Sequence, residues 1–323
     1  MSDISHGLGG GAAGHGVSAA GLVHPGEMGA AVGACLAGRG LRVLWASQGR
    51  SRATAGRATA AGLVDAGTVA EVAAGAEVML SVCPPHAALD VARSLAGFRG
   101  LYVDANATSP ATSREVGRVV TDGGATFVDG GIIGGPPRTP GGCRLYLSGP
   151  EAGRVAALFE GTALEARVVG EDAGAASAVK MAYAAWTKGS AALLLTARAL
   201  ARAEGVEDTL VEEWEQSQPG ALRRCQPAAS SALAKGWRWV GEMDEIAAAM
   251  SAAGLPDGFH QAAAEVYRRS AAGAGPAAEA GRRPAAGAGA GRETAGVPGG
   301  KDALSAVLDS QLSCPLHGPW PSQ

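Results

Sequence analysis

Aromatic residues, paired cysteines and long apolar segments are scarce in this chain of 323 residues. Only 4% of the residues are aromatic, whereas 50 are glycine, so we expect tight turns and close helix packing. The five cysteines are scattered, odd in number and without a C-x-x-C motif, which excludes a disulfide framework and indicates reduced thiols in an intracellular protein. The most apolar predicted helix, residues 190–200, contains Arg198 and is too short to cross a membrane.

Other absences limit the possible partners and chemistries. The net charge is −3 and the basic residues are scattered, so no nucleic-acid partner is expected. The six histidines show no H-x-x-x-H spacing and no cysteine cluster accompanies them, which argues against a metal site. A G-x-S-x-G elbow and a Walker P-loop are also missing. Residues 1–16 lack the cationic and apolar parts of a signal peptide, so we expect a cytoplasmic protein with no membrane partner.

What the chain does contain is a glycine-rich turn between a predicted strand (17–23) and a predicted helix. Gly26 would let the backbone approach a pyrophosphate, and Gly29 would let helix and strand pack closely. The helix N-terminus favours an anion. His24 occupies the first glycine position of G-x-G-x-x-G, so the match is incomplete and a plain turn is the alternative. We predict a dinucleotide site made by Gly21, His24, Pro25, Gly26, Glu27, Met28 and Gly29.

The segment after the second predicted strand (41–45) indicates which dinucleotide binds. An NAD site has an acidic residue about 20 positions beyond the glycines, but residues 41–64 contain none. Two arginines and two serines stand there instead, and arginine binds phosphate in a bidentate way. The sequence therefore predicts a 2′-phosphate site and NADP, at Ser47, Arg50, Ser51 and Arg52. A solvated loop with a helix N-cap at Ser51 is the alternative.

Strands and helices continue to alternate as far as residue 158, which predicts an α/β fold with a doubly wound (Rossmann) parallel sheet. Further strands are expected at 78–82, 101–104, 125–129 and 143–148, and helices at 68–74, 85–95, 110–120 and 150–158. Ligands bind at the carboxyl ends of such strands. The candidates for cofactor binding there are Cys83, Pro84, Pro85 and Asn106.

From residue 173 the pattern becomes wholly helical, with helices expected at 173–204, 207–216, 220–234, 240–253 and 256–270. We divide the chain into a disordered extension (1–16), an NADP-binding Rossmann domain (17–172), a helical substrate and dimerisation domain (173–270) and a disordered Ala/Gly/Pro-rich tail (271–323). Within the tail, one weak helix is expected from Asp302 to Leu312. Because the helical domain is small for an independent core, we also expect a homodimer.

The order of these motifs resembles the β-hydroxyacid dehydrogenase family, the relatives of 6-phosphogluconate dehydrogenase, in the branch with a DUF1932-type C-terminal domain. The residues that carry the resemblance are the turn 26–29, the segment 104–110, the stretch from Asp129 to Gly135, and Gly174 with Lys180. The resemblance implies hydride transfer between NADP(H) and a small hydroxy or keto compound, with Lys180 as general acid/base. It implies substrate binding by Asn106, Ala107, Gly134 and Gly135. Lys188, on nearly the same helix face as Lys180, and His260 are further candidates.

Three departures from the family pattern affect the substrate. Ala176 replaces a glycine, Ala184 stands where the family has an asparagine, and Ile133 stands where it has a serine. These replacements remove polar groups that hold a small hydroxyacid in the family, so the resemblance does not imply the family's usual substrate for this chain. Two alternatives stay open, an imine reductase on the same fold, which usually has another residue at the lysine position, and a non-catalytic NADP-binding protein.

Overall fold

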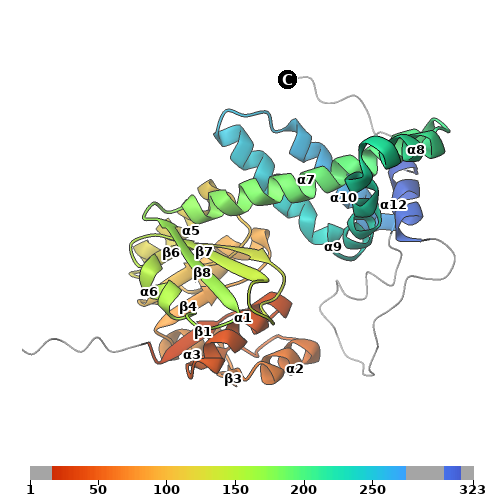
Figure 1. Ribbon diagram of the computed structural model, residues 1–323. Helices are drawn as coiled ribbons and strands as arrows, with labels where there is room; N and C mark the ends of the chain where they lie inside the picture. The colour runs from red at the N-terminus through yellow and green to blue at the C-terminus, as the bar shows by residue number, and fades with distance from the viewer. Residues whose placement is uncertain (1–16, 274–301, 314–323) are drawn as a thin grey trace, which may run out of the picture.

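The computed structural model describes residues 17–273 and 302–313. The expected extension 1–16 and the remainder of the expected tail lie outside the described residues. Figure 1 shows a sheet-containing part at the N-terminal side and a helical part at the C-terminal side, and the long helix α7 (Ala175–Ala203) runs from one to the other.

The sheet has eight strands in the order β3-β2-β1-β4-β5-β6-β7-β8. Neighbouring strands are parallel except β6 and β7, which pair antiparallel. The strands are β1 (Ala19–Leu22), β2 (Arg42–Trp45), β3 (Val64–Asp65), β4 (Val78–Ser81), β5 (Leu101–Asp104), β6 (Thr126–Gly134), β7 (Cys143–Ser148) and β8 (Leu164–Gly170). The predicted doubly wound α/β fold is confirmed, but β7 is a correction to the all-parallel sheet. A parallel crossover needs a dozen or more residues, and residues 135–142 are too few.

The helices follow the predicted pattern closely in the first part of the chain. Ser51 caps α2, where its Oγ accepts a hydrogen bond from Thr54 N at 3.2 Å, and Ser109 caps α5 in the same way through Thr112. The helices are α1 (Glu27–Gly38), α2 (Arg52–Ala60), α3 (Val69–Gly75), the 3-10 turn η1 (Pro85–Ala87), α4 (Ala88–Ser94), α5 (Pro110–Asp122), α6 (Ala152–Ala157), α7 (Ala175–Ala203), α8 (Glu207–Ser217), α9 (Pro219–Ala252), α10 (Gly258–Gly273) and α12 (Ala303–Leu312).

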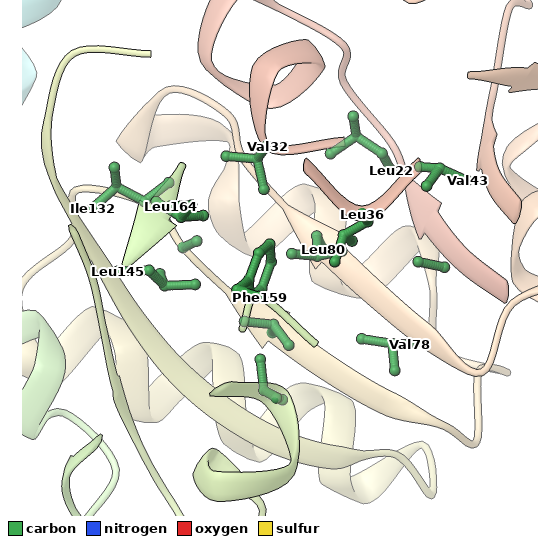
Figure 2. Close-up of a cluster of buried hydrophobic side chains, with 14 of the residues drawn as sticks. Leu22, Val32, Leu36, Val43, Val78, Leu80, Ile132, Leu145, Phe159 and Leu164 are labelled. Atoms are coloured by element: carbon green, nitrogen blue, oxygen red, sulfur yellow. The ribbon is translucent and has the colours of Figure 1, made fainter. Parts of the chain in front are cut away.

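Two apolar clusters cover the two faces of the sheet, because successive residues of a strand point to opposite faces. On β4, Val78 and Leu80 belong to one cluster and Met79 to the other. Figure 2 shows the first cluster, in which the ring of Phe159 lies among Leu36, Leu80 and other aliphatic side chains. The second cluster is covered by α3, α4 and α5. Helices on both faces leave the strand ends as the open edge of this part.

The helical part has its own core, formed where α7, α9, α10 and α12 meet. Helix α9 is one continuous element where two helices were expected; it continues through Pro227 and past Gly236, where a Cβ would lie 3.1 Å from the carbonyl oxygen of Tyr267. Among the described helices, none combines the length and the apolar character needed to cross a membrane.

Residues 302–313 contain the helix that was expected from Asp302 to Leu312, but as a packed element and not as part of a disordered tail. They form α12, whose Val307 and Leu308 are fully buried against α7, α9 and α10. Gln311 Nε2 also donates a hydrogen bond to the carbonyl oxygen of Val266 at 3.1 Å. This helix is therefore a packed element of the helical part, and tertiary contacts rather than its own propensity hold it.

Candidate functional site

The glycine turn has the shape that the sequence predicts. Gly26 is the N-cap of α1, and no described atom lies within 4 Å of the place where its Cβ would be, so a ligand can approach the backbone there. At Gly29 a Cβ would lie 2.4 Å from the carbonyl oxygen of His24, so only glycine allows this close packing of helix and strand. At Gly21 a Cβ would lie 2.7 Å from the side chains of Met79 and Val72. The turn therefore offers free backbone at a helix N-terminus, which is a site for an anionic group.

The remaining turn residues frame this site. His24 Nδ1 is buried without a hydrogen-bond partner among the described residues, and burial, with the charge of Arg50 adding to it, lowers the pKa of His24 to about 4. The imidazole is therefore neutral at physiological pH. Glu27 is exposed and lies 3.7 Å from Arg138, while Met28 packs against the first core cluster.

Two arginines of the segment after β2 reach back to the glycine turn. Arg50 Nη2 donates a hydrogen bond to the carbonyl oxygen of Val23 at 3.4 Å, and Arg57 Nε donates to that of Pro25 at 3.5 Å. Arg57 escaped the sequence analysis, although it is a third cation in the same acid-free segment. Arg52, at the start of α2, is exposed, and the carbonyl of Ser47 accepts a hydrogen bond from Arg50 N at 3.0 Å.

The N-cap at Ser51 that the alternative expected is present, since the hydroxyl of Ser51 accepts the capping bond of α2, and this cap leaves the 2′-phosphate site as a prediction. An acceptor role in the cap does not use the hydroxyl proton. The segment therefore places guanidinium groups beside the turn and a helix N-terminus behind them.

At the carboxyl ends of β4 and β5, the side chain of Asn106 is fully engaged within the protein. Its Oδ1 accepts a hydrogen bond from Cys83 N at 2.6 Å, and its Nδ2 donates to Ser81 Oγ at 2.9 Å and to Asp104 Oδ1. Asn106 is only 2% exposed. It fixes the loop after β4 to the loop after β5, so its side chain positions the site instead of facing a ligand.

Asp104 is a buried carboxyl beside this amide. Burial, with the charge of Asp129 adding to it, raises the pKa of Asp104 to about 8, so the group is mostly protonated at neutral pH. Its Oδ2 has no hydrogen-bond partner among the described residues. The neighbouring Pro84 and Pro85 begin η1, which contacts α9, and Ala107 packs against the core of the helical part.

Asp129 joins the sheet to α7. Its carboxylate accepts five hydrogen bonds: Oδ1 from Ser113 Oγ at 2.7 Å and Ser177 Oγ at 2.6 Å, and Oδ2 from Ser148 Oγ, Gly174 N and Ser177 N, each at 3.0 Å. The last two donors are first-turn amides of α7, which a helix leaves without internal partners. Asp129 therefore caps α7 from a neighbouring strand and fixes the position of Lys180 one turn further on.

The glycines that follow Asp129 have different roles. At Gly131 a Cβ would lie 2.9 Å from Cβ of Lys180, so this glycine allows α7 to approach β6. Gly134 has φ +118° and faces the carbonyl oxygen of Gly142 across the β6–β7 hairpin, whereas the space around Gly135 is open. Both glycines of the predicted pair are exposed, and Gly135 is the one with open space beside its Cα.

Lys180 and Lys188 meet at Glu242, which α9 supplies. Lys180 Nζ lies 3.4 Å from Glu242 Oε1, and Lys188 Nζ donates a hydrogen bond to Glu242 Oε2. The three side chains are 15%, 16% and 9% exposed, in that order. The sequence predicts a helix over 240–253 but no role for Glu242, because no local pattern reveals a contact between residues so far apart in the chain.

The electrostatics of this cluster follow from its burial. Burial alone would raise the pKa of Glu242, but the two ammonium groups outweigh it and the net direction is downward. Burial lowers the pKa of Lys188 to about 8; Glu242 opposes this shift and Lys180 adds to it. With all three groups in their charged forms, the cluster carries two positive charges and one negative charge.

Aromatic side chains hold Lys188. Its Nζ lies 5.3 Å from the ring centroid of Trp239, and Tyr267 Oη donates a hydrogen bond to its carbonyl oxygen at 2.7 Å. Trp239 and Tyr267 pack edge to face at 5.0 Å. His260 lies nearby on α10, 7% exposed and against Gly189. Burial lowers the pKa of His260, with the backbone of Ala185 opposing the shift.

This combination of a glycine turn at a helix N-terminus, a doubly wound sheet and a buried lysine beside it defines a nicotinamide-dinucleotide-binding protein of two domains. Residues 19–176 match the family model of the NAD binding domain of 6-phosphogluconate dehydrogenase. Residues 201–270 match a domain of unknown function, DUF1932. The chain thus combines one segment that matches the NAD binding domain of 6-phosphogluconate dehydrogenase with another that matches DUF1932, and these two matches confirm the resemblance found in the sequence.

Similar proteins agree with this assignment. A protein of Methanothermus fervidus, described as an uncharacterized 28.5 kDa protein in the 7S RNA 5′ region, is 32% identical over 143 residues, which are 44% of this chain and 55% of that protein. The conserved protein MTH1747, of unknown function and described as structurally similar to 3-hydroxyacid dehydrogenases, is 27% identical with a TM-score of 0.59, over 81% of this chain and 98% of that chain.

Two characterised enzymes share the fold. The 3-hydroxyisobutyrate dehydrogenase of Mycobacterium tuberculosis is 20% identical with a TM-score of 0.62, over 79% of this chain and 94% of that one. A reductive aminase of Aspergillus terreus is 19% identical with a TM-score of 0.50, over 78% of this chain and 93% of that one. The fold is therefore that of hydroxyacid dehydrogenases and is shared with enzymes that act on amines.

Proposed function

We propose that the protein is an NADP-dependent oxidoreductase that transfers hydride between NADP(H) and a small hydroxy or keto compound, with Lys180 as general acid/base. The observation that carries the proposal is the placement of Lys180. The Asp129 cap and the close approach at Gly131 hold its helix against the sheet, and its ammonium group is buried beside Glu242. A lysine held in this way is ready to exchange a proton with a bound substrate.

The residues of the N-terminal part fit a dinucleotide. The open backbone at Gly26 suits a pyrophosphate, and a Cβ at Gly29 would prevent the turn from forming. Arg50 and Arg57 suit the additional 2′-phosphate of NADP, since the same segment lacks the acidic residue that would hold a ribose hydroxyl. When bound, the nicotinamide supplies or accepts a hydride.

The protein's own part of the reaction is proton transfer. A carbonyl carbon that accepts a hydride leaves a negative charge on its oxygen, and Lys180 donates a proton to that oxygen. In the reverse direction, neutral Lys180 takes the hydroxyl proton. Asn106 keeps the strand-end loops in place, and the open backbone of Gly135 is available to a carboxylate of the substrate.

The charge of the lysine cluster supports a carbonyl or hydroxy substrate over an imine. In their charged forms Lys180, Lys188 and Glu242 together carry a net charge of +1, in a region that is largely shielded from water. A protonated imine is a cation and is repelled by such a site, whereas an anionic keto or hydroxy acid is attracted.

The test is the Lys180→Met variant, assayed with NADPH against a panel of keto acids, ketones and imines. We expect kcat to fall by about 10²- to 10⁴-fold, as general acid/base catalysis is typically worth, with the Kd of NADPH unchanged. Lys235→Met, at an exposed position of α9, is the matched control and should retain full turnover. Near-full turnover by Lys180→Met would refute the role of the lysine. Turnover of imines alone would then favour an imine reductase, and no turnover by the wild type would favour a non-catalytic binding protein.

A further inference from the structure

Glu242 of α9 contacts Lys180 and Lys188 of α7, the helix that runs from the sheet-containing part to the helical part. Glu242 belongs to the DUF1932 domain and is 9% exposed, so water cannot solvate its charge. One turn further along α9, Glu245 Oε2 accepts hydrogen bonds from Ser109 N at 2.7 Å and from Thr112 Oγ1 at 2.9 Å, at the start of α5. Glu242 therefore lies on a helix face that is fixed against the dinucleotide-binding domain.

We propose that Glu242 and Lys188 are positioning residues for Lys180: Glu242 holds its ammonium group, and Lys188 cancels the charge of Glu242 so that Lys180 can release its proton. This inference rests on the proposed function for its catalytic meaning, while the coupling of the three groups is independent of any substrate.

The net charge that the three groups bury changes when Lys180 gives up its proton. Before proton transfer, the three groups carry +1. After Lys180 has given up its proton, Glu242 and Lys188 remain as a neutral ion pair, and no uncompensated charge is left in the interior. Without Lys188, the same transfer would leave a buried carboxylate alone, which would pull the proton back to Lys180. Without Glu242, two buried ammonium groups would repel each other, and one of them would lose its proton at a lower pH.

The surroundings of Lys188 fit this role. The Trp239 ring and the Tyr267 hydroxyl fix its position, and Glu242 Oε2 accepts its hydrogen bond. Burial lowers the pKa of Lys188 to about 8, and the charge of Glu242 opposes this shift, so the contact with Glu242 favours the charged form that this role requires.

Other titratable groups border the cluster and enter any measurement of it. Arg238 of α9 adds to the lowering of the pKa of Lys188, and the Glu242 charge adds to the raised pKa of Tyr267, whose main cause is burial. Burial raises the pKa of Cys143 of β7, and the charge of Lys180 opposes this shift. His260 of α10 is buried against Gly189, beside Lys188.

The experiment follows the lysine side chains by NMR, with ¹³C-labelled lysine, as a function of pH in the full chain without ligand. The chain has four lysines, at 180, 188, 235 and 301, so single substitutions assign the signals, and the exposed Lys235 is the internal reference. The variants are Glu242→Gln, Lys188→Met and the double variant with both changes.

We expect Glu242→Gln to lower the midpoint of the Lys180 titration by about 1–3 pH units and Lys188→Met to raise it, since a neighbouring charge shifts a pKa by that amount. The double variant should return the midpoint to within about half a unit of the wild type. A purely structural role of Glu242 would not be rescued in this way. If Glu242→Gln does not fold, Lys188→Met and the double variant still decide the matter.

A Lys180 titration that is the same in all four proteins would overturn the proposal, and so would a double variant shifted as far as one of the single variants. The pH profile of kcat separates this outcome from a failure of the proposed function. If the titrations shift as expected but the profile does not follow them, the charge coupling stands and the catalytic role of Lys180 is wrong.

Discussion

Gly131 and Lys180 approach each other so closely that a Cβ on Gly131 would lie 2.9 Å from Cβ of Lys180 and 2.8 Å from the carbonyl oxygen of Ala176. Ala176 is itself fully buried at the start of α7. The position of the lysine thus depends on a glycine in a different element, since Gly131 belongs to β6 and Lys180 to α7.

This contact makes Gly131→Ala a test of how α7 is placed. The added methyl group forces α7 away from β6, and overpacking of this kind typically costs about 1–3 kcal/mol of unfolding free energy. Urea unfolding should therefore show a lower midpoint, and kcat should fall because Lys180 moves. Gly97→Ala, where no described atom lies within 4 Å of the new Cβ, is the control and should unfold like the wild type. Equal midpoints for both variants would contradict the prediction.

Much of the N-terminal part was predictable because its signals are local. The turn around Gly26, the caps Ser51 and Ser109, and four of the central strands each follow from a few neighbouring residues. Strand β8 was missed because most of its residues are partly or fully exposed and only Leu164 is buried, so it shows no alternating pattern.

The features that the sequence did not fully predict depend on contacts between residues far apart in the chain. Helix α12 lies where one weak helix was expected, but its packing against other helices through buried Val307 and Leu308 was not predicted, because the overall composition of the segment suggests disorder. The lysine cluster was half predicted: Lys180 and Lys188 share a helix face and could be paired from their spacing, but Glu242 comes from another helix. Sequence spacing finds partners on one element and not across elements.

The cofactor preference is tested at Arg50. Its guanidinium group lies beside the glycine turn, where it can bind a 2′-phosphate, and a charged hydrogen bond of this kind contributes about 1.5–3 kcal/mol. In Arg50→Gln, the Kd of NADPH should rise about 10- to 100-fold, while that of NADH changes little. Fluorescence titration measures both constants. Arg39→Gln, at an exposed position after α1, is the control. A wild type that binds both cofactors equally well would refute the NADP assignment.

The structural role of α12 is tested at Leu308. This side chain is fully buried, and truncating a buried leucine to alanine costs about 2–5 kcal/mol. Leu308→Ala should therefore lower the urea midpoint of unfolding clearly. Leu312→Ala, in the same helix but 47% exposed, should change it by much less. If both variants unfold at the wild-type midpoint, the packing of α12 contributes nothing to the stability of the protein.

The last prediction concerns assembly, which we propose is a homodimer formed through the helical part. On α7, Trp186, Leu193 and Leu200 are 70%, 56% and 62% exposed. They are spaced seven residues apart, so they form one apolar stripe along the helix, the arrangement that two helices use when they pack together. Sedimentation velocity should show a dimer for the wild type and a monomer for the Leu193→Glu/Leu200→Glu variant, because a buried pair of carboxylates is strongly unfavourable. Leu255→Glu, which is 54% exposed in the turn before α10, is the control and should remain dimeric. A wild type that sediments as a monomer at every concentration, or a double variant that stays dimeric, would show that this stripe is not the dimer interface.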